Sequence, residues 1–302
     1  MRANVNRPAV DSRNHPPYVL TMKDESNAQN SPIRLSCRLE VLPGDTVRER
    51  LNLAAVYGFD AVSVPGRYLD EFREPLLACK GNSPLPLAAL SLGFEGSLLS
   101  PHAAERTRCR ESLLRLFDLC AELDIPAFNM PPVLIQDNPE RISAADGFSS
   151  VQERLDAMLL GQLPELGDEA RKRGVQLLLE PVNRSESEYL NRVGHAADLC
   201  RRLAHPNIGL TADFYHMHTE EADIPRALRE AGPHLKLVHV AEAVARTEPG
   251  SGSMDFRPGF AALKQMGYGG FLEVECRTLS GPPDEVLPAA VGYLRSIWDE
   301  AQ

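Results

Sequence analysis

The chain has 302 residues, of which 43% are hydrophobic and 25% charged, and its formal net charge is −10. This composition is ordinary for a globular protein with a large core. An acidic chain is poorly suited to covering nucleic acid, because such surfaces are usually basic. No apolar run reaches the length of a membrane span, and the N-terminus lacks the apolar stretch of a secretory signal. We therefore expect a cytoplasmic protein with neither nucleic acid nor a membrane as partner.

The six cysteines lie far apart, and no two of them form a CxxC pair. This spacing predicts neither a disulfide framework nor a structural zinc site. We expect buried thiols in a reducing compartment.

The first 32 residues differ in character from the rest of the chain. They are polar, contain four prolines and show no sustained hydrophobic period. We predict a disordered N-terminal arm over residues 1–32 and one folded domain over residues 33–302.

Short apolar runs and amphipathic segments alternate from Ile33 onward. Strands are expected over residues 33–41, 61–64, 87–92, 127–130, 175–181, 208–214, 235–241 and 270–276. Apolar residues that recur with the period of a helix predict helices over residues 46–58, 103–123, 150–174, 194–204, 224–231, 256–266 and 285–300. This alternation predicts a parallel sheet with helices outside it.

Eight such units over about 270 residues predict an α/β fold of the closed (β/α)₈ TIM barrel type. A doubly wound sheet is the alternative. A doubly wound sheet that binds a nucleotide typically has a glycine-rich phosphate-binding turn after its first strand. Residues 39–45, LEVLPGD, do not match such a turn.

Polar side chains stand at the ends of the last four expected strands. They are Glu180, Asp213, His239 and, on the last strand, Glu273 and Glu275. Because the carboxyl ends of barrel strands meet at one face, these groups are expected to lie together. Clustered buried carboxylates need a cation or several arginines, and three carboxylates with one imidazole suit Mn²⁺, Mg²⁺ or Co²⁺. The strand period of two places both glutamates of the last strand on the same side, so spacing leaves that choice open.

Three arginines, Arg184, Arg246 and Arg277, also lie near these strand ends. They would suit a carboxylate or phosphate of a ligand. Alternatively, they pair with acidic neighbours. The acidic candidates are Glu186, Glu242 and Glu248.

The second half of the chain resembles a known superfamily. Residues 180–186, EPVNRSE, resemble the strand-five motif of the xylose isomerase-like sugar isomerases and epimerases. Residues 213–217, DFYHM, resemble their strand-six motif, and residues 239–252 and 267–275 resemble the last two strands. The match is specific over residues 175–277, and the D-tagatose 3-epimerase and hydroxypyruvate isomerase types are the most similar in pattern.

The resemblance implies the metal ligands Glu180, Asp213, His239 and Glu275, and its register favours Glu275 over Glu273. The implied cofactor is one divalent ion, with Mn²⁺ first and Mg²⁺ or Co²⁺ as alternatives.

The resemblance also implies roles around the ion. Glu180 and Glu275 would be catalytic as an acid–base pair, and His216 would be a catalytic group at the carbonyl end of the substrate. Glu186, Arg246 and His216 would bind the substrate.

The sequence departs from the family pattern in several places. His239 resembles the 3-epimerases, whereas the offset of Arg246 from Glu242 resembles hydroxypyruvate isomerase. Ser63 stands where the family often has a glutamate. The lysine motif of true xylose isomerases is not evident, and the many histidines of the related endonuclease IV are absent, which argues against phosphodiester cleavage.

The resemblance therefore implies a metal-dependent isomerase or epimerase of carbohydrate metabolism. It would remove a proton next to a carbonyl of a sugar or keto acid through a metal-stabilised enediolate. One alternative is a dehydratase or lyase of the same superfamily, similar to 3-dehydroshikimate dehydratase. Another is a sugar-binding barrel without activity. A homodimer or homotetramer is expected.

Overall fold

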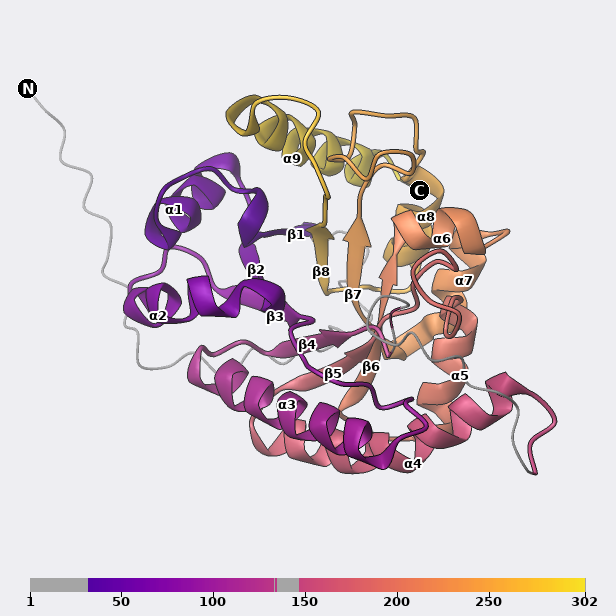
Figure 1. Cartoon of the computed structure of the whole chain (residues 1–302). Coiled ribbons are helices and arrows are strands. Elements are labelled where there is room, and N and C mark those ends of the chain that lie inside the picture. Colours follow the sequence, from indigo (N-terminus) through magenta and orange to yellow (C-terminus); the bar gives the residue numbers. More distant parts are fainter. Residues whose placement is uncertain (1–31, 133, 135–146, 302) are drawn as a thin grey trace, which may run out of the picture.

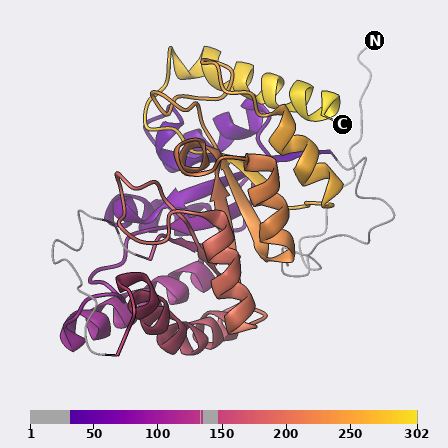
Figure 2. The same ribbon diagram turned by 90° about the vertical axis from the view of Figure 1, so that its right-hand side faces the viewer.

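Eight parallel strands close into a barrel in the computed structural model of the protein, and helices surround them (Figures 1 and 2). The structure describes residues 32–132, 134 and 147–301. Residues 1–31 of the predicted arm lie outside this described part, so the arm stays a prediction. The barrel confirms the predicted fold class and not the doubly wound sheet.

The strands are short, and each pairs in parallel with its neighbours, the ring closing between the first and the last. They are β1 (Arg34–Arg38), β2 (Ala61–Pro65), β3 (Leu87–Ser91), β4 (Ala127–Met130), β5 (Gln176–Leu179), β6 (Ile208–Asp213), β7 (Leu235–Val240) and β8 (Phe271–Val274). The prediction that the first strand extends to residue 41 is wrong. Leu39–Val41 instead form a 3₁₀ helix directly after the strand.

The helices cover the outside of the barrel, and none in the described part is both long and apolar enough to cross a membrane. They are α1 (Val47–Tyr57), α2 (Leu69–Cys79), α3 (Ala103–Glu122), α4 (Val151–Lys172), α5 (Val193–Leu203), α6 (Phe214–Glu220), α7 (Ile224–Ala231), α8 (Arg257–Gln265) and α9 (Pro283–Glu300). All six cysteines are buried free thiols, as expected.

Two helices, α2 and α6, were not expected from the sequence. Pro75 lies inside α2 and lacks the N–H of a helical residue, although Phe72 and Leu76 still form the buried side of the helix. Helix α6 begins directly at the end of β6, where Asp213 serves as its N-cap and accepts a hydrogen bond from the N–H of Tyr215.

The interior of the barrel changes from apolar to polar toward the site. Ala61, Ala127 and Phe271 belong to a small apolar cluster. The residues two positions later on the same strands face the same side and are polar. With their buried neighbours they form the polar layer of Ser36, Ser63, Ser91, Asn129, Thr211 and Glu273. Hydrogen bonds cross this layer, as from Thr211 Oγ1 to Asn129 Oδ1 at 2.7 Å.

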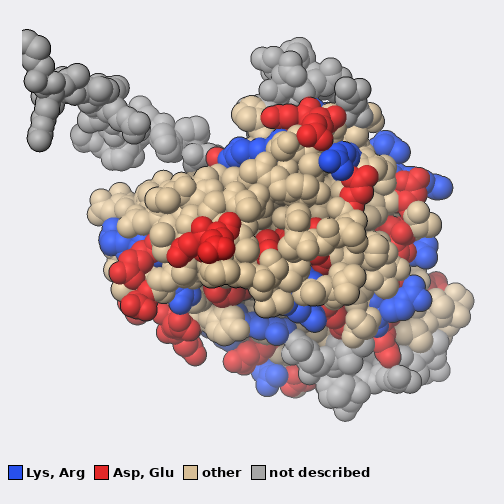
Figure 3. Space-filling model, turned by 90° about the horizontal axis from the view of Figure 1, so that it is seen from above, with Lys and Arg blue, Asp and Glu red and all other residues tan. Residues whose placement is uncertain are grey.

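Charged side chains of both signs are interspersed on the face shown in Figure 3, and Lys and Arg do not gather there into one basic area. On this face, the distribution agrees with the expectation, based on the acidic net charge, that the protein has no basic surface for nucleic acid.

Gly66→Ala is expected to destabilise the protein. Gly66 follows β2, and an added Cβ would overlap with the backbone carbonyl of Leu92, which a side-chain rotation cannot relieve. We expect a loss of about 1–3 kcal/mol in the free energy of unfolding, measured with denaturant. The matched control is Gly161→Ala at an exposed position of α4, where an added Cβ meets nothing within 4 Å. It should stabilise by roughly 0.5–1 kcal/mol, and equal effects of the two changes would contradict the packing argument.

Candidate metal centre and active site

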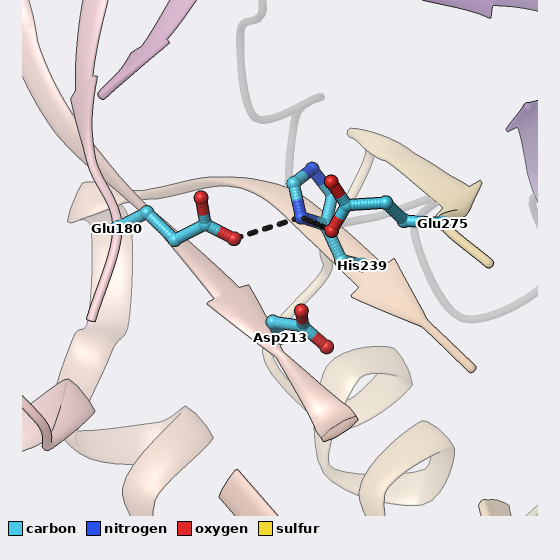
Figure 4. A group of neighbouring side chains, drawn as sticks. All are labelled: Glu180, Asp213, His239 and Glu275. Carbon is cyan, nitrogen blue, oxygen red and sulfur yellow. Dashed lines mark hydrogen bonds and ion pairs between the residues drawn. The ribbon is translucent and has the colours of Figure 1, made fainter. Parts of the chain in front are cut away.

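Four acidic and imidazole side chains converge at the carboxyl ends of the last four strands (Figure 4). Glu180 directly follows β5, Asp213 ends β6, His239 lies in β7, and Glu275 directly follows β8. One ligand atom from each lies within 4.8 Å of the others. The structure thus brings together the four residues predicted as metal ligands.

The backbone fixes the direction of two of these carboxylates. The N–H of Glu180 donates to the carbonyl of Met130 at 3.1 Å, and the N–H of Glu275 donates to that of Val240 at 3.2 Å. Both glutamates are therefore tied to the neighbouring strand although they lie just past their own. At Asp213, Oδ1 accepts from the N–H of Tyr215 at 2.8 Å, which leaves Oδ2 facing the site.

His239 lies between two carboxylates. Its Nδ1 is 2.9 Å from Oε1 of Glu180 and 3.0 Å from Oε2 of Glu275. Burial alone would lower the pKa of His239, but Glu275 and Glu180 raise it well above its usual value. Burial would likewise raise the pKa of Glu180, yet His239 holds it below its usual range.

Two guanidinium groups neutralise Glu275. Arg246 Nη2 donates to Glu275 and, at 2.8 Å, to Oδ2 of Asp213, and Arg38 Nη1 also contacts Glu275. Despite burial, Arg246 and then His239 hold the pKa of Glu275 well below its usual range. Sequence reasoning missed Arg38. The signal was available, because Arg38 ends β1 as the candidate ligands end later strands.

The arginine pairs differ in part from those expected. Arg184 pairs with Glu220 at 2.8 Å rather than with Glu186, and Arg277 pairs with Glu186 at 2.6 Å. The expected partner Glu242 instead accepts from backbone N–H groups of the loop after β7, at Gly250 and Met254. The other expected partner, Glu248, accepts from Ser280.

A cavity of about 510 Å³ opens above the cluster. Its lining includes Glu180, Glu186, His216, Arg246 and Glu275 from the second half of the chain, and Arg38, Arg67 and Tyr68 from the first. His216 is buried, and its Nε2 lies 3.4 Å from Oδ2 of Asp213. The residues predicted to bind substrate, Glu186, His216 and Arg246, therefore share one cavity with two of the four candidate ligands, Glu180 and Glu275, and their roles stay predictions.

Glu273 lies one layer deeper than Glu275. It is fully buried, accepts a hydrogen bond from Ser63, and has Oε1 3.7 Å from Nε2 of His239. Neither of those two atoms has a hydrogen-bond partner among the described residues. Burial raises the pKa of Glu273. The structure therefore groups Glu275 with the other candidate ligands and places Glu273 behind the imidazole.

The donor set fits a divalent cation. It offers three carboxylates and one imidazole, the ligands that hard to borderline ions prefer. Each side chain offers one atom to the centre, where Arg246 Nη2 also contacts Oδ2 of Asp213 and Oε2 of Glu275. At Glu180, for example, Oε2 accepts from Asn129 Nδ2 at 2.7 Å, while Oε1 faces His239.

Binding of Mn²⁺ is expected to release a proton near pH 7. The raised pKa of His239 means that the free protein holds a proton on Nδ1, which the ion must displace. Below that pKa, the apparent affinity should rise with pH by about tenfold per unit, because one proton leaves per ion. Calorimetric titration in two buffers of different ionisation enthalpy measures the release. Equal heats in both buffers would contradict it.

The fold and the site together define a class. Residues 51–297 match the family described as xylose isomerase-like TIM barrel, and the chain belongs to that family. It is 25% identical to the 3-dehydro-D-guloside 4-epimerase of Escherichia coli (strain K12) over 263 residues, covering 83% of this chain and 95% of the relative. It is 35% identical to the ketose 3-epimerase of Arthrobacter globiformis over 134 residues, 44% of this chain and 45% of that one.

A solved structure agrees in fold. The apo crystal structure of 3-keto-D-glucoside 4-epimerase from E. coli superposes with a TM-score of 0.75 at 22% identity, covering 87% of this chain and 99% of that one. The match of residues 51–297 to the family confirms the predicted family, and the names of the relatives agree with the prediction that the chain is an isomerase or epimerase.

Proposed function

We propose that the protein is a divalent-metal-dependent epimerase or isomerase that removes and returns a proton next to the carbonyl of a sugar. The observation that carries the proposal is the placement of Glu180 and Glu275 on either side of His239, at the base of one cavity (Figure 4). Two carboxylates facing one space can each reach a different face of the same carbon, as epimerisation requires.

The charge state of the two glutamates suits this role. Both have a pKa below the usual range, so both are ionised near neutral pH and one can accept a proton. A divalent ion held by Glu180, Asp213, His239 and Glu275 would supply the positive charge that stabilises an enediolate. Close placement of base and substrate compensates for the weak basicity of these carboxylates.

Other residues of the cavity would hold the substrate. Glu186 lies 2.6 Å from Arg277 and 3.9 Å from Arg246, and this ion pair can position the hydroxyl groups of a sugar. His216 lies beside Asp213 and can contact the carbonyl oxygen. The names of the relatives, a ketose 3-epimerase and a 3-dehydro-D-guloside 4-epimerase, support a substrate that is a ketose or a keto-sugar.

The test is a screen of ketoses, ketose phosphates, keto-glycosides and keto acids in D₂O with Mg²⁺, followed by NMR. The true substrate should take up deuterium at a carbon next to its carbonyl, and the uptake should stop when a chelator is added. Loss of a hydroxyl group with the exchange would identify a dehydratase instead. Metal-dependent binding without exchange at any carbon would overturn the proposal in favour of a binding protein.

A further inference from the structure

The two ring nitrogens of His216 have different surroundings. Nδ1 points away from the candidate ligands and lies 3.2 Å from the backbone N of Asn183 and 2.9 Å from its side-chain Nδ2. Nε2 lies on the opposite side of the ring, 3.4 Å from Oδ2 of Asp213. A backbone N–H can only donate, so Nδ1 must offer a lone pair to Asn183.

The amide of Asn183 has only one consistent orientation. Its Oδ1 accepts from the backbone N–H of Ser185 at 3.0 Å and from the hydroxyl of the same serine. An amide NH₂ cannot accept the backbone N–H, so the oxygen must face Ser185 and the NH₂ must face His216. Both Asn183 donors therefore point at Nδ1, and the single proton of His216 is left on Nε2.

We propose that Asn183 is a positioning residue that holds His216 in its Nε2–H tautomer. The tautomer follows from the hydrogen bonds alone, while its use in catalysis rests on the proposed function. With Nδ1 occupied and a proton on Nε2, His216 presents only a donor to the cavity. It stabilises negative charge on the carbonyl oxygen of the substrate and takes no proton from carbon, which leaves proton transfer to Glu180 and Glu275.

The geometry also explains why this role falls to Asn183. It stands in the loop directly after β5, three residues beyond Glu180, and the N–H groups of Glu186 and Ser187 donate to its carbonyl oxygen at 2.9 and 3.1 Å. One residue thus fixes both the loop that carries Glu186 and the ring of His216. An aspartate at position 183 has the same shape but only acceptor oxygens in its side chain. Its charged carboxylate would compete for Nδ1 with the more distant backbone N–H of the same residue and should draw a proton onto Nδ1.

The first experiment is ¹⁵N NMR of histidine-labelled protein, metal-free and with Mg²⁺, with the His216→Asn variant to assign the signal. The expected wild-type spectrum has the proton of His216 on Nε2 and an unprotonated Nδ1. A proton on Nδ1 in the wild type overturns the inference. This spectrum needs no substrate, so it can refute the tautomer while the proposed function stands. The correct tautomer without exchange of any ketone would refute only the function.

The second experiment compares Asn183→Asp with Asn191→Ala, which lies in the same loop. Asn191 Nδ2 donates to the carbonyls of Val182 and Ser187 at 2.7 and 2.9 Å and does not bond to His216. Asn183→Asp should protonate Nδ1 and lower kcat on the order of a hundredfold, with KM and Mg²⁺ affinity little changed. The control should keep the wild-type His216 spectrum.

Two results would contradict the positioning role. One is an Asn183→Asp protein that keeps the wild-type His216 spectrum but loses activity, because the amide would then act through the loop. The other is an altered spectrum with unchanged kcat. If Asn183→Asp does not fold, Asn183→Ala takes its place. It removes the nearer of the two donors to Nδ1, and a mixture of tautomers with a smaller loss of kcat is then the expected result.

Discussion

Glu275→Gln is expected to reduce turnover on the order of 10⁴-fold, because one change removes both a candidate metal ligand and a proton carrier. It also removes the carboxylate that the guanidinium groups of Arg38 and Arg246 neutralise. The effect should appear in kcat for deuterium exchange of the substrate found in the D₂O screen, measured at saturating Mn²⁺.

The matched control for this change is Glu273→Gln. Glu273 stands two residues earlier on the same strand and faces the same side, but it lies in the polar layer behind His239. Because Glu273 supports a ligand and is not one itself, Glu273→Gln should lower kcat by no more than about 10–100-fold. A larger loss from Glu273→Gln than from Glu275→Gln would show that the two glutamates have been assigned the wrong way round.

Asp213→Asn and His239→Gln are expected to abolish the rise in melting temperature that Mn²⁺ gives the wild type. An ion that binds only the folded state stabilises it by about 2.7 kcal/mol at a concentration of 100 Kd, and the loss of a ligand removes that gain. The change at Asp213 is well suited to the test, because asparagine also caps helices and should preserve the start of α6. Thermal unfolding with and without Mn²⁺ measures the effect.

Glu186→Gln serves as the comparison in the same thermal experiment. Glu186 pairs with Arg277 at the cavity wall and is not among the four converging side chains. The variant should keep the metal-induced rise while turnover falls. Complete loss of the rise in Glu186→Gln would mean that this glutamate holds the ion and that the ligand set is wrong.

Much of the barrel follows from local patterns, because apolar runs and helical stripes are set by burial against a common core. Helix α2 could not be predicted in this way, because Pro75 interrupts the helical pattern although tertiary packing still buries Phe72 and Leu76. Helix α6 could not be predicted either, because Asp213 both ends a strand and caps a helix. Local pattern therefore gives the element type more readily than its ends.

The candidate ligands could be predicted because polar residues that follow apolar strands are conspicuous. The depth of each glutamate within the barrel could not be predicted from spacing, because the strand period of two places Glu273 and Glu275 on the same side. The motif resemblance was needed to choose between them. Pairing partners were also out of reach. Glu220, which binds Arg184, lies 36 residues away in the chain, and the pairing of β5 with β6 brings it near.

The two halves of the chain contribute different parts of the site. All four converging side chains lie at the ends of β5 to β8. In the cavity wall, Arg38 ends β1, and Arg67 and Tyr68 lie in the 3₁₀ helix Gly66–Tyr68 that follows β2. The first half of the barrel thus contributes to the cavity wall but not to the converging cluster, so substitutions there can change the shape of the cavity while the four converging side chains stay unchanged. Chimeras with a related barrel could exploit this division, and the contact between Arg38 and Glu275 is the junction that they must preserve.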